Sequence, residues 1–311
     1  MFFYSIQLKR RIYGLFCFGL VLSGLAFLYK EIYRPTHTFK NVKADLVIPK
    51  ENTLLKRPQL LSQIEERNKT HDENAQKIDV VALVGEKGSG KTVLARYYGY
   101  SQHDRTVWEF NAENKETLAR SFRDFAYSLA ETKSEKQELL QIETIESPEI
   151  KDLSLLSFVR KILKEQKNWL LIYDNITNFP EIENYFPLDT TLWGVGKVIL
   201  VTRDENIKNT SYIKPEYIIK VGELQKEDAL ILFTSILFDF FPQELDIEKK
   251  EEALRFLNQI PHFPLDVSIA ARYIKNGNIS YEKYLDLLNQ KDLAFEKLQN
   301  MIVVEASDYL K

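Results

Sequence analysis

The chain has 311 residues, of which 44% are hydrophobic and 28% are charged, with a formal net charge of −3. This ordinary globular composition predicts about two domains and enough apolar residues for a sizeable core. Because basic residues do not dominate, we expect no nucleic-acid partner. The single cysteine excludes a disulfide framework within one chain, and the four histidines show no metal-ligand spacing.

An apolar segment near the N-terminus is the first predicted element. Residues 12–29, IYGLFCFGLVLSGLAFLY, contain no charged side chain and are just long enough to cross a membrane. Tyr13 and Tyr29 lie at its ends, where interfacial aromatic residues anchor a span. We therefore favour an uncleaved transmembrane helix over residues 12–30, after a short tail, 1–11. A cleaved signal peptide and a buried core helix are the alternatives.

Residues 31–53 are polar, contain Pro35 and Pro49, and are typical of a linker. Residues 54–222 alternate apolar runs with helical patterns, which predicts an α/β domain with a parallel sheet and right-handed crossovers. From residue 223 to 311 the pattern is helical, and the apolar helix in EDALILFTSILFDFF should be buried. The expected strands are 80–84, 106–110, 169–173, 197–202 and 217–221, and the expected helical segments include 115–130 and 153–165.

The sequence GEKGSGKT, residues 85–92, lies between the first strand and a helical pattern. It matches the spacing G-x-x-x-x-G-K-[ST] of a phosphate-binding P-loop. Its glycines let the backbone aim successive N–H groups inward, and the N-terminus of the following helix adds to the anion hole. In this motif the lysine reaches the β- and γ-phosphates and the hydroxyl ligates Mg²⁺. These roles are predicted for Lys91 and Thr92.

Two further strands end in polar residues that suit the same ligand. The run NWLLIYDN leads into Asp174, which is the form of a Walker B strand whose carboxylate holds the Mg²⁺ shell. The run KVILVTRD presents Arg203 at its end, where a cation can contact a γ-phosphate. Because strand ends in open α/β sheets face the ligand crevice, we expect both side chains to lie near Lys91.

In this order the motifs resemble the STAND class of P-loop NTPases and, within it, the NB-ARC type. The resemblance covers residues 52–288. It implies a five-stranded sheet of order 2-3-4-1-5 followed by an α-helical subdomain, with ATP or ADP and Mg²⁺ as ligands. Besides the P-loop and the two strands above, it rests on NTLLKRPQLLSQI, VWEFNAENKETLARSF, VGELQKEDALILF and IPHFPLDVSIAARYIKNGNISYEKYLDLL.

The resemblance also implies a set of site residues. Arg57 would lie near the nucleotide, Pro264 would pack against the adenine, and Arg203 would sense the γ-phosphate. Thr92 and Asp174 would hold the metal. The predicted catalytic set is Lys91, Asp174, Asn175 and Arg203. The predicted nucleotide-binding set is Gly85, Glu86, Lys87, Gly88, Ser89, Gly90, Lys91, Thr92, Val93, Arg57 and Pro264.

One departure from the family pattern bears on activity. Many members have a second acid after the Mg²⁺ aspartate, whereas this chain has Asn175. An amide can hold a water molecule by hydrogen bonds but cannot act as a base. The resemblance implies a nucleotide-dependent signalling switch that self-associates in its ATP state, and Asn175 indicates that it hydrolyses ATP slowly. The alternative is an assembly or interaction module that binds nucleotide without hydrolysing it.

Complete members of the family continue into a winged-helix domain and usually a repeat array. No repeat of this kind is visible before Lys311. The chain is therefore either a fragment of a longer protein or a reduced member.

The expected ligand also decides the membrane orientation. Basic residues on the two sides of the apolar segment favour opposite orientations. ATP is plentiful only inside the cell, so a working P-loop requires a cytoplasmic body. We therefore expect a single-pass membrane protein whose NTPase body lies in the cytoplasm.

Overall fold

The computed structural model describes residues 42–44, 46–49, 54–67, 77–166, 168–210, 213–238 and 245–290. The predicted transmembrane segment, 12–30, and the N-terminal tail lie outside the described residues. Within the described part, no helix combines the length and the apolar character that crossing a bilayer requires.

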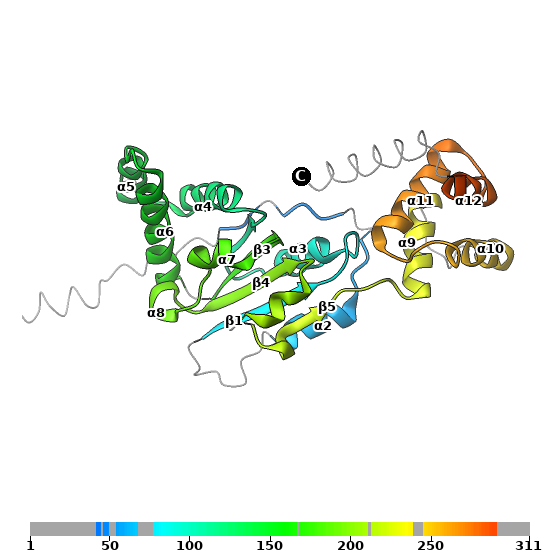
Figure 1. Ribbon diagram of the computed structural model, residues 1–311, viewed down its shortest axis with the longest axis horizontal. Helices are drawn as coiled ribbons and strands as arrows, with labels where there is room; N and C mark the ends of the chain where they lie inside the picture. Colours follow the sequence, from blue (N-terminus) through cyan, green and yellow to red (C-terminus); the bar gives the residue numbers. More distant parts are fainter. Residues whose placement is uncertain are drawn as a thin grey trace, which may run out of the picture. The chain divides into compact units, whose positions relative to one another are not determined.

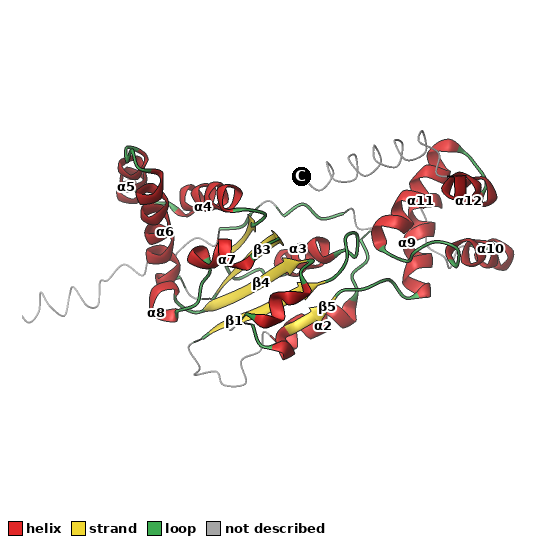
Figure 2. Cartoon of the chain, viewed as in Figure 1, coloured by secondary structure: helices red, strands yellow, loops and turns green. Residues whose placement is uncertain are grey.

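A parallel five-stranded sheet forms the centre of the α/β domain (Figures 1 and 2). The order of its strands is β2-β3-β4-β1-β5, as the family resemblance implies. Every pairing between these strands is parallel, and each predicted strand overlaps an observed one. The strands are β1 (Ile78–Val84), β2 (Val107–Asn111), β3 (Trp169–Ile176), β4 (Gly196–Thr202) and β5 (Ile218–Lys220).

Helices cover both faces of this sheet, which explains why its central strands are continuous apolar runs. Side chains of α2 (Pro58–Arg67) and α3 (Lys91–Tyr100) join one apolar cluster with alternate residues of β1, β3 and β4. Side chains of α4 (Lys115–Leu129) and α6 (Pro148–Glu165) join a second cluster with the other residues of the same strands. The remaining elements of this domain are α5 (Lys133–Glu143), α7 (Phe179–Ile182), α8 (Thr190–Trp193) and the 3₁₀ turns η1 (Glu183–Tyr185), η2 (Glu205–Asn209) and η3 (Pro215–Tyr217).

Helix α6 begins five residues before its predicted start at residue 153. The side chain of Ser147 caps it by accepting a hydrogen bond from the backbone N–H of Ile150. Pro148 occupies the first turn, where its missing N–H costs nothing. The apolar periodicity starts only after this polar first turn, so periodicity alone places the helix start too late.

The helical subdomain has a core of its own. It consists of α9 (Lys226–Phe238), α10 (Ile247–Leu257), α11 (Pro264–Gly277) and α12 (Tyr281–Gln290). The apolar helix predicted in this region is α9, and it is buried on most of its sides as expected. Its core residues include Ala229, Leu230, Phe233, Ala253, Phe256, Leu257, Val267, Ala270, Ala271, Ile274 and Tyr284.

Part of the predicted linker packs against the edge of the sheet. We call residues 42–44 and 46–49 the strap. Lys43 forms a parallel bridge with Val107, the first residue of β2. The backbone N–H of Val107 donates to the carbonyl of Val42 at 2.8 Å, and that of Ala44 donates to the carbonyl of Val107 at 2.9 Å. The strap therefore extends the sheet beyond its edge strand.

Candidate functional site

The loop of residues 85–92 connects β1 to α3. Gly88 and Gly90 have φ angles of 84° and 87°, in the left-handed region that favours glycine. Gly88 is also closely packed, because a Cβ at this position would lie 2.8 Å from the Cβ of Leu265. Helix α3 starts at Lys91 without a side-chain cap, so its first N–H groups are available to an anion.

Lys91 is 7% exposed and lies across this loop. Its Nζ donates hydrogen bonds to the carbonyl oxygens of Gly85 at 2.9 Å and Glu86 at 2.8 Å. Burial lowers the pKa of Lys91, and the positive charge of Arg203 lowers it further, although nearby carboxylates act in the opposite direction. A buried ammonium that faces a second cation would be stabilised by a polyanion such as a phosphate chain.

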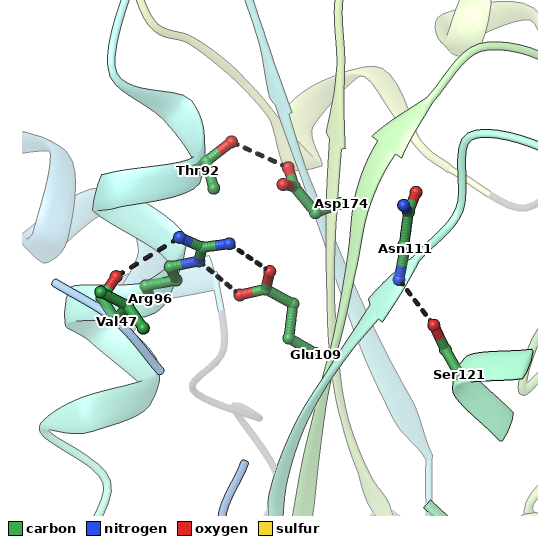
Figure 3. Close-up of polar contacts among 7 residues, drawn as sticks. All are labelled: Val47, Thr92, Arg96, Glu109, Asn111, Ser121 and Asp174. Atoms are coloured by element: carbon green, nitrogen blue, oxygen red, sulfur yellow. Dashed lines mark hydrogen bonds and ion pairs between the residues drawn. The ribbon is translucent and has the colours of Figure 1, made fainter. Parts of the chain in front are cut away.

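Thr92 and Asp174 meet at the end of β3 (Figure 3). The hydroxyl of Thr92 donates to Oδ1 of Asp174 at 2.9 Å. Burial raises the pKa of Asp174, and the charge of Glu109 adds to this effect, whereas the hydrogen bond from Thr92 opposes it. A hydroxyl and a carboxylate in contact are oxygen ligands of the type that Mg²⁺ takes.

The described residues contain no cluster of three or more His, Cys, Asp or Glu side chains placed to hold a metal ion. A Mg²⁺ ion at Thr92 and Asp174 would therefore need water or phosphate oxygens as its other ligands. Magnesium sites commonly combine one or two protein oxygens with substrate phosphates in this way. The two residues thus fit a metal that arrives with a nucleotide.

Asn175 lies near the end of β3, and Arg203 follows the neighbouring strand β4. Asn175 has a φ of 64°, and the pairing of β3 with β4 shifts register between Tyr173 and Ile176. Such a bulge re-aims the side chains around it, and asparagine tolerates the left-handed conformation better than most residues. Arg203 comes directly after β4. Both residues line the same pocket as Lys91 and Asp174.

Arg57 joins the loop to the beginning of the helical subdomain. Its guanidinium donates to the carbonyl of Ser89 at 3.1 Å and to those of Gly222 and Glu223 at 3.2 Å. Burial lowers the pKa of Arg57, and the charge of Asp228 partly offsets this. These hydrogen bonds of Arg57 all go to backbone carbonyl oxygens of the protein.

Helix α11 packs on the loop from the side of the helical subdomain. The backbone N–H of Leu265 donates to the carbonyl of Gly88 at 3.2 Å. The ring of Pro264, the first residue of α11, would lie 3.5 Å from a Cβ placed on Gly90. The loop and the helix thus form two walls of one pocket.

This pocket has a volume of about 620 Å³, which is within the ordinary range for small-molecule sites. Six Lys or Arg residues and a single carboxylate, Asp174, line it among the described residues. This balance suits an anionic ligand. The cationic residues are Arg57, Lys87, Lys91, Arg203, Arg272 and Lys275.

Most of the predicted site residues are brought together by this pocket. Gly85, Glu86 and Ser89 do not line it, but they are the loop residues whose oxygens surround the Lys91 ammonium. The predicted residues that line it are Arg57, Lys87, Gly88, Gly90, Lys91, Thr92, Val93, Asp174, Asn175, Arg203 and Pro264.

A family model of the NB-ARC domain matches residues 62–240, which is more than half of the chain. The chain belongs to the NB-ARC family. The resemblance inferred from the motifs is thereby confirmed. The match includes the P-loop, Asp174 and Arg203, and its bounds leave out Arg57 and Pro264. No curated protein matches this NB-ARC chain.

Several solved structures are similar to this NB-ARC chain. A STAND protein with a tetratricopeptide repeat sensor from Pyrococcus horikoshii is 16% identical with a TM-score of 0.46, and the match covers 79% of this chain and 34% of that one. Cdc6p from Pyrobaculum aerophilum is 14% identical with a TM-score of 0.44, covering 80% and 66%. Drosophila ORC bound to DNA is 16% identical with a TM-score of 0.46, covering 76% and 66%. The NB-ARC chain thus spans 34% of the STAND protein's length.

Other pocket residues of the NB-ARC chain were missed by the sequence-based predictions. One group follows Pro264 at helical spacing on one face of α11. This group could have been identified from the sequence if a helix had been predicted to start at Pro264. A second group comes from the strap, which has no local motif, and from the apolar helix α9, whose pattern indicates burial and not ligand contact. The first group is Ser268, Arg272, Lys275 and Asn276, and the second is Ile48, Pro49, Leu232 and Ile236.

Proposed function

We propose that this NB-ARC chain is a nucleotide-operated signalling switch that binds ATP or ADP with Mg²⁺ and hydrolyses ATP slowly. Lys91 would contact the β- and γ-phosphates, and Arg203 the γ-phosphate. Thr92 and Asp174 would hold Mg²⁺, which supplies charge neutralisation to the phosphates when bound. The observation that best supports this proposal is that residues from three separate motifs line one pocket.

The switch would operate through contacts between the loop and α11. A ligand in this pocket touches residues of the α/β domain and of the helical subdomain, such as Arg203 and Ser268. A nucleotide that binds the two domain arrangements with different affinity shifts their populations by that difference. We propose that ADP favours the closed arrangement and that exchange for ATP opens a surface for self-association.

Replacing the P-loop lysine tests the binding part of this proposal. Lys91→Ala should weaken MgATP binding by about 10- to 100-fold, the usual contribution of a charge-assisted hydrogen bond. A titration with a fluorescent ATP analogue measures this change. Lys208→Ala removes an exposed lysine that does not line the pocket and should bind normally. If Lys91→Ala binds like the wild type, the pocket is not a phosphate site.

A module that binds nucleotide without turnover is the second candidate function. It is favoured by Asn175, which is not a base, and by the presence of one carboxylate among the described lining residues. Steady-state phosphate release separates the two functions. A slow rate that Lys91→Ala abolishes supports the switch. Tight nucleotide binding with no detectable phosphate release supports the second candidate.

We further propose that residues 12–30 anchor the chain in a membrane, with the NTPase body in the cytoplasm. The support is an 18-residue stretch without charge beside a domain that requires ATP. Carbonate extraction of membranes should leave the full chain in the pellet, and deletion of residues 12–30 should release it. Protease added to intact cells should not digest the body. Digestion from outside would reverse the proposed orientation.

A further inference from the structure

The strap connects the edge of the sheet to the pocket. After residues 42–44 pair with β2, Leu46 packs on α3 in the apolar cluster on that face of the sheet. The contact is close, because a Cβ added to Gly99 would lie 2.9 Å from Cδ1 of Leu46. Helix α3 is the helix that begins with the P-loop lysine. The strap therefore rests on the element that presents the phosphate-binding residues.

Arg96 holds three pieces of the fold together (Figure 3). Its Nε and Nη2 atoms donate to the two carboxylate oxygens of Glu109 on β2, each at 2.7 Å. Its Nη1 atom donates to the carbonyl of Val47 in the strap at 3.4 Å. The side chains of the pair are only 15% and 17% exposed, so the bidentate geometry fixes the guanidinium plane and aims Nη1 at the strap.

The two strap residues after Val47 line the pocket. Ile48 and Pro49 stand among its lining residues together with the apolar side chains of Leu55, Leu232 and Ile236. Apolar side chains offer no hydrogen bond or charge to a phosphate, but they suit the flat apolar face of a base. The phosphate-binding groups lie instead on the loop and the strand ends. The strap thus contributes apolar side chains to the lining of the pocket.

We propose that Arg96 is a positioning residue, which holds the strap so that Ile48 and Pro49 form a wall against the base of a bound nucleotide. This inference rests on the proposed nucleotide-binding function of the pocket. Arg96 itself does not line the pocket, so it acts through Val47. It follows that replacing Arg96 should weaken the binding of ligands that carry a base and should leave the binding of a bare phosphate chain unchanged.

The test compares MgATP with magnesium tripolyphosphate on the full chain. Ile48→Ala should weaken MgATP binding by about tenfold, from the apolar area lost against the base. Arg96→Lys keeps a cation beside Glu109, but a single ammonium cannot reach Glu109 and Val47 as the planar fork does. It should weaken MgATP binding to a similar extent. Tripolyphosphate should bind both variants as it binds the wild type, in calorimetric titrations.

The double variant shows whether Arg96 acts through the strap. If it does, Arg96→Lys combined with Ile48→Ala should weaken MgATP binding no more than the stronger single change does. The matched control is Arg123→Lys, which alters an ion pair with Glu143 at a position that does not line the pocket. This control should bind both ligands normally.

Three results would overturn the inference. They are an unchanged MgATP affinity in Ile48→Ala, equal losses for MgATP and tripolyphosphate in Arg96→Lys, and additive effects in the double variant. Failure of the proposed function has a different signature. In that case the wild-type chain binds neither ligand, or Lys91→Ala binds both as tightly as the wild type.

Discussion

Two adjacent residues at the end of β3, Asp174 and Asn175, are constrained by different physical effects. Asp174 is partly buried beside Thr92, and its carboxylate is the group that suits a metal. In the sequence pattern, Asn175 is notable only because it replaces an acid that could act as a base. Its φ of 64° adds a conformational reason, because asparagine enters the left-handed region more easily than an alanine does. The bulge favours Asn175 independently of hydrolysis.

The conformational role of Asn175 can be separated from any role in hydrolysis. Asn175→Ala should lower the free energy of unfolding by about 1 kcal/mol, because alanine is strained at positive φ. Asn175→Gly should be close to neutral, since glycine carries no such strain. Urea denaturation of the nucleotide-free chain measures both variants. Equal stability of the alanine and glycine variants would show that the backbone does not constrain this position.

The raised pKa of Asp174 affects metal binding and folding stability in opposite directions as the pH changes. Metal binding requires the ionised carboxylate. As the pH is lowered, Mg²⁺-dependent nucleotide binding should therefore begin to weaken at a higher pH than the ordinary Asp pKa of about 4 would give. For stability, a raised pKa means that the folded chain holds this proton more tightly than the unfolded chain. The stabilisation it provides is complete below the unfolded pKa and is lost as the pH rises through the folded pKa.

Asp174→Asn should therefore be more stable than the wild type at neutral pH without nucleotide, and it should lose Mg²⁺-dependent binding. The gain in stability should shrink as the pH is lowered through the raised pKa of the wild-type carboxyl, which lies above the ordinary Asp value. Thermal unfolding across this range, with a Mg²⁺ titration, measures both effects. If the D174N variant is less stable than the wild type at neutral pH, the assigned cause of the pKa shift is wrong.

At the scale of elements, the P-loop (residues 85–92) and α11 pack closely against each other. Gly88 needs to be glycine for its positive φ and also for the close approach of Leu265. Leu265 lies far along the chain from this loop, so the second contact is a tertiary constraint on a local motif. The P-loop pattern tolerates several residue types at this position. The packing of α11 is what excludes a side chain here.

Gly88→Ala should therefore lower the free energy of unfolding by more than the P-loop pattern, which accepts other residues at this position, would indicate. We expect a loss of about 2–3 kcal/mol in unfolding free energy, from left-handed strain and overpacking together. Nucleotide affinity should fall as well, because α11 must shift away from the pocket. Gly277→Ala, at the exposed end of the same helix, should be neutral or slightly stabilising. Similar denaturation curves for the two variants would contradict the proposed fit.

At the scale of the whole described chain, the α/β domain and the helical subdomain are joined at residues 221–225. Two apolar clusters lie on the two faces of the sheet, and a third lies among helices α9 to α12. Hydrogen bonds cross the junction: Arg57 donates to the carbonyls of Gly222 and Glu223, and the backbone N–H of Leu265 donates to the carbonyl of Gly88 at 3.2 Å. A few hydrogen bonds between separate cores are the kind of connection at which domain closure occurs.

Self-association should depend on the nucleotide if closure controls an interface. With a non-hydrolysable ATP analogue and Mg²⁺, light scattering should give a mass above that of one chain, and with ADP it should give the mass of one chain. Lys91→Ala should stay at the mass of one chain under both conditions, at an analogue concentration that saturates the wild type but not the weaker-binding variant. A wild-type mass that is the same with the ATP analogue and with ADP would contradict the switch.

The sequence alone determined the parts of this protein whose physics is local. Strands buried on both faces must be continuous apolar runs, so the parallel sheet could be predicted. The P-loop and the polar strand ends carry their chemistry in a few adjacent residues, so Lys91, Thr92, Asp174 and Arg203 could be placed near one another. The family match from residue 62 to 240 confirms the class that these motifs indicate.

Only the tertiary structure decided which distant segments complete the pocket. Ile48 and Pro49 come from a stretch whose composition predicts a linker, and their place in the wall depends on edge pairing with β2 and on Arg96. Arg57 makes its contacts with backbone carbonyls, which no side-chain pattern encodes. Such contacts join residues far apart in the chain, and they can stabilise the protein only after the apolar clusters have formed.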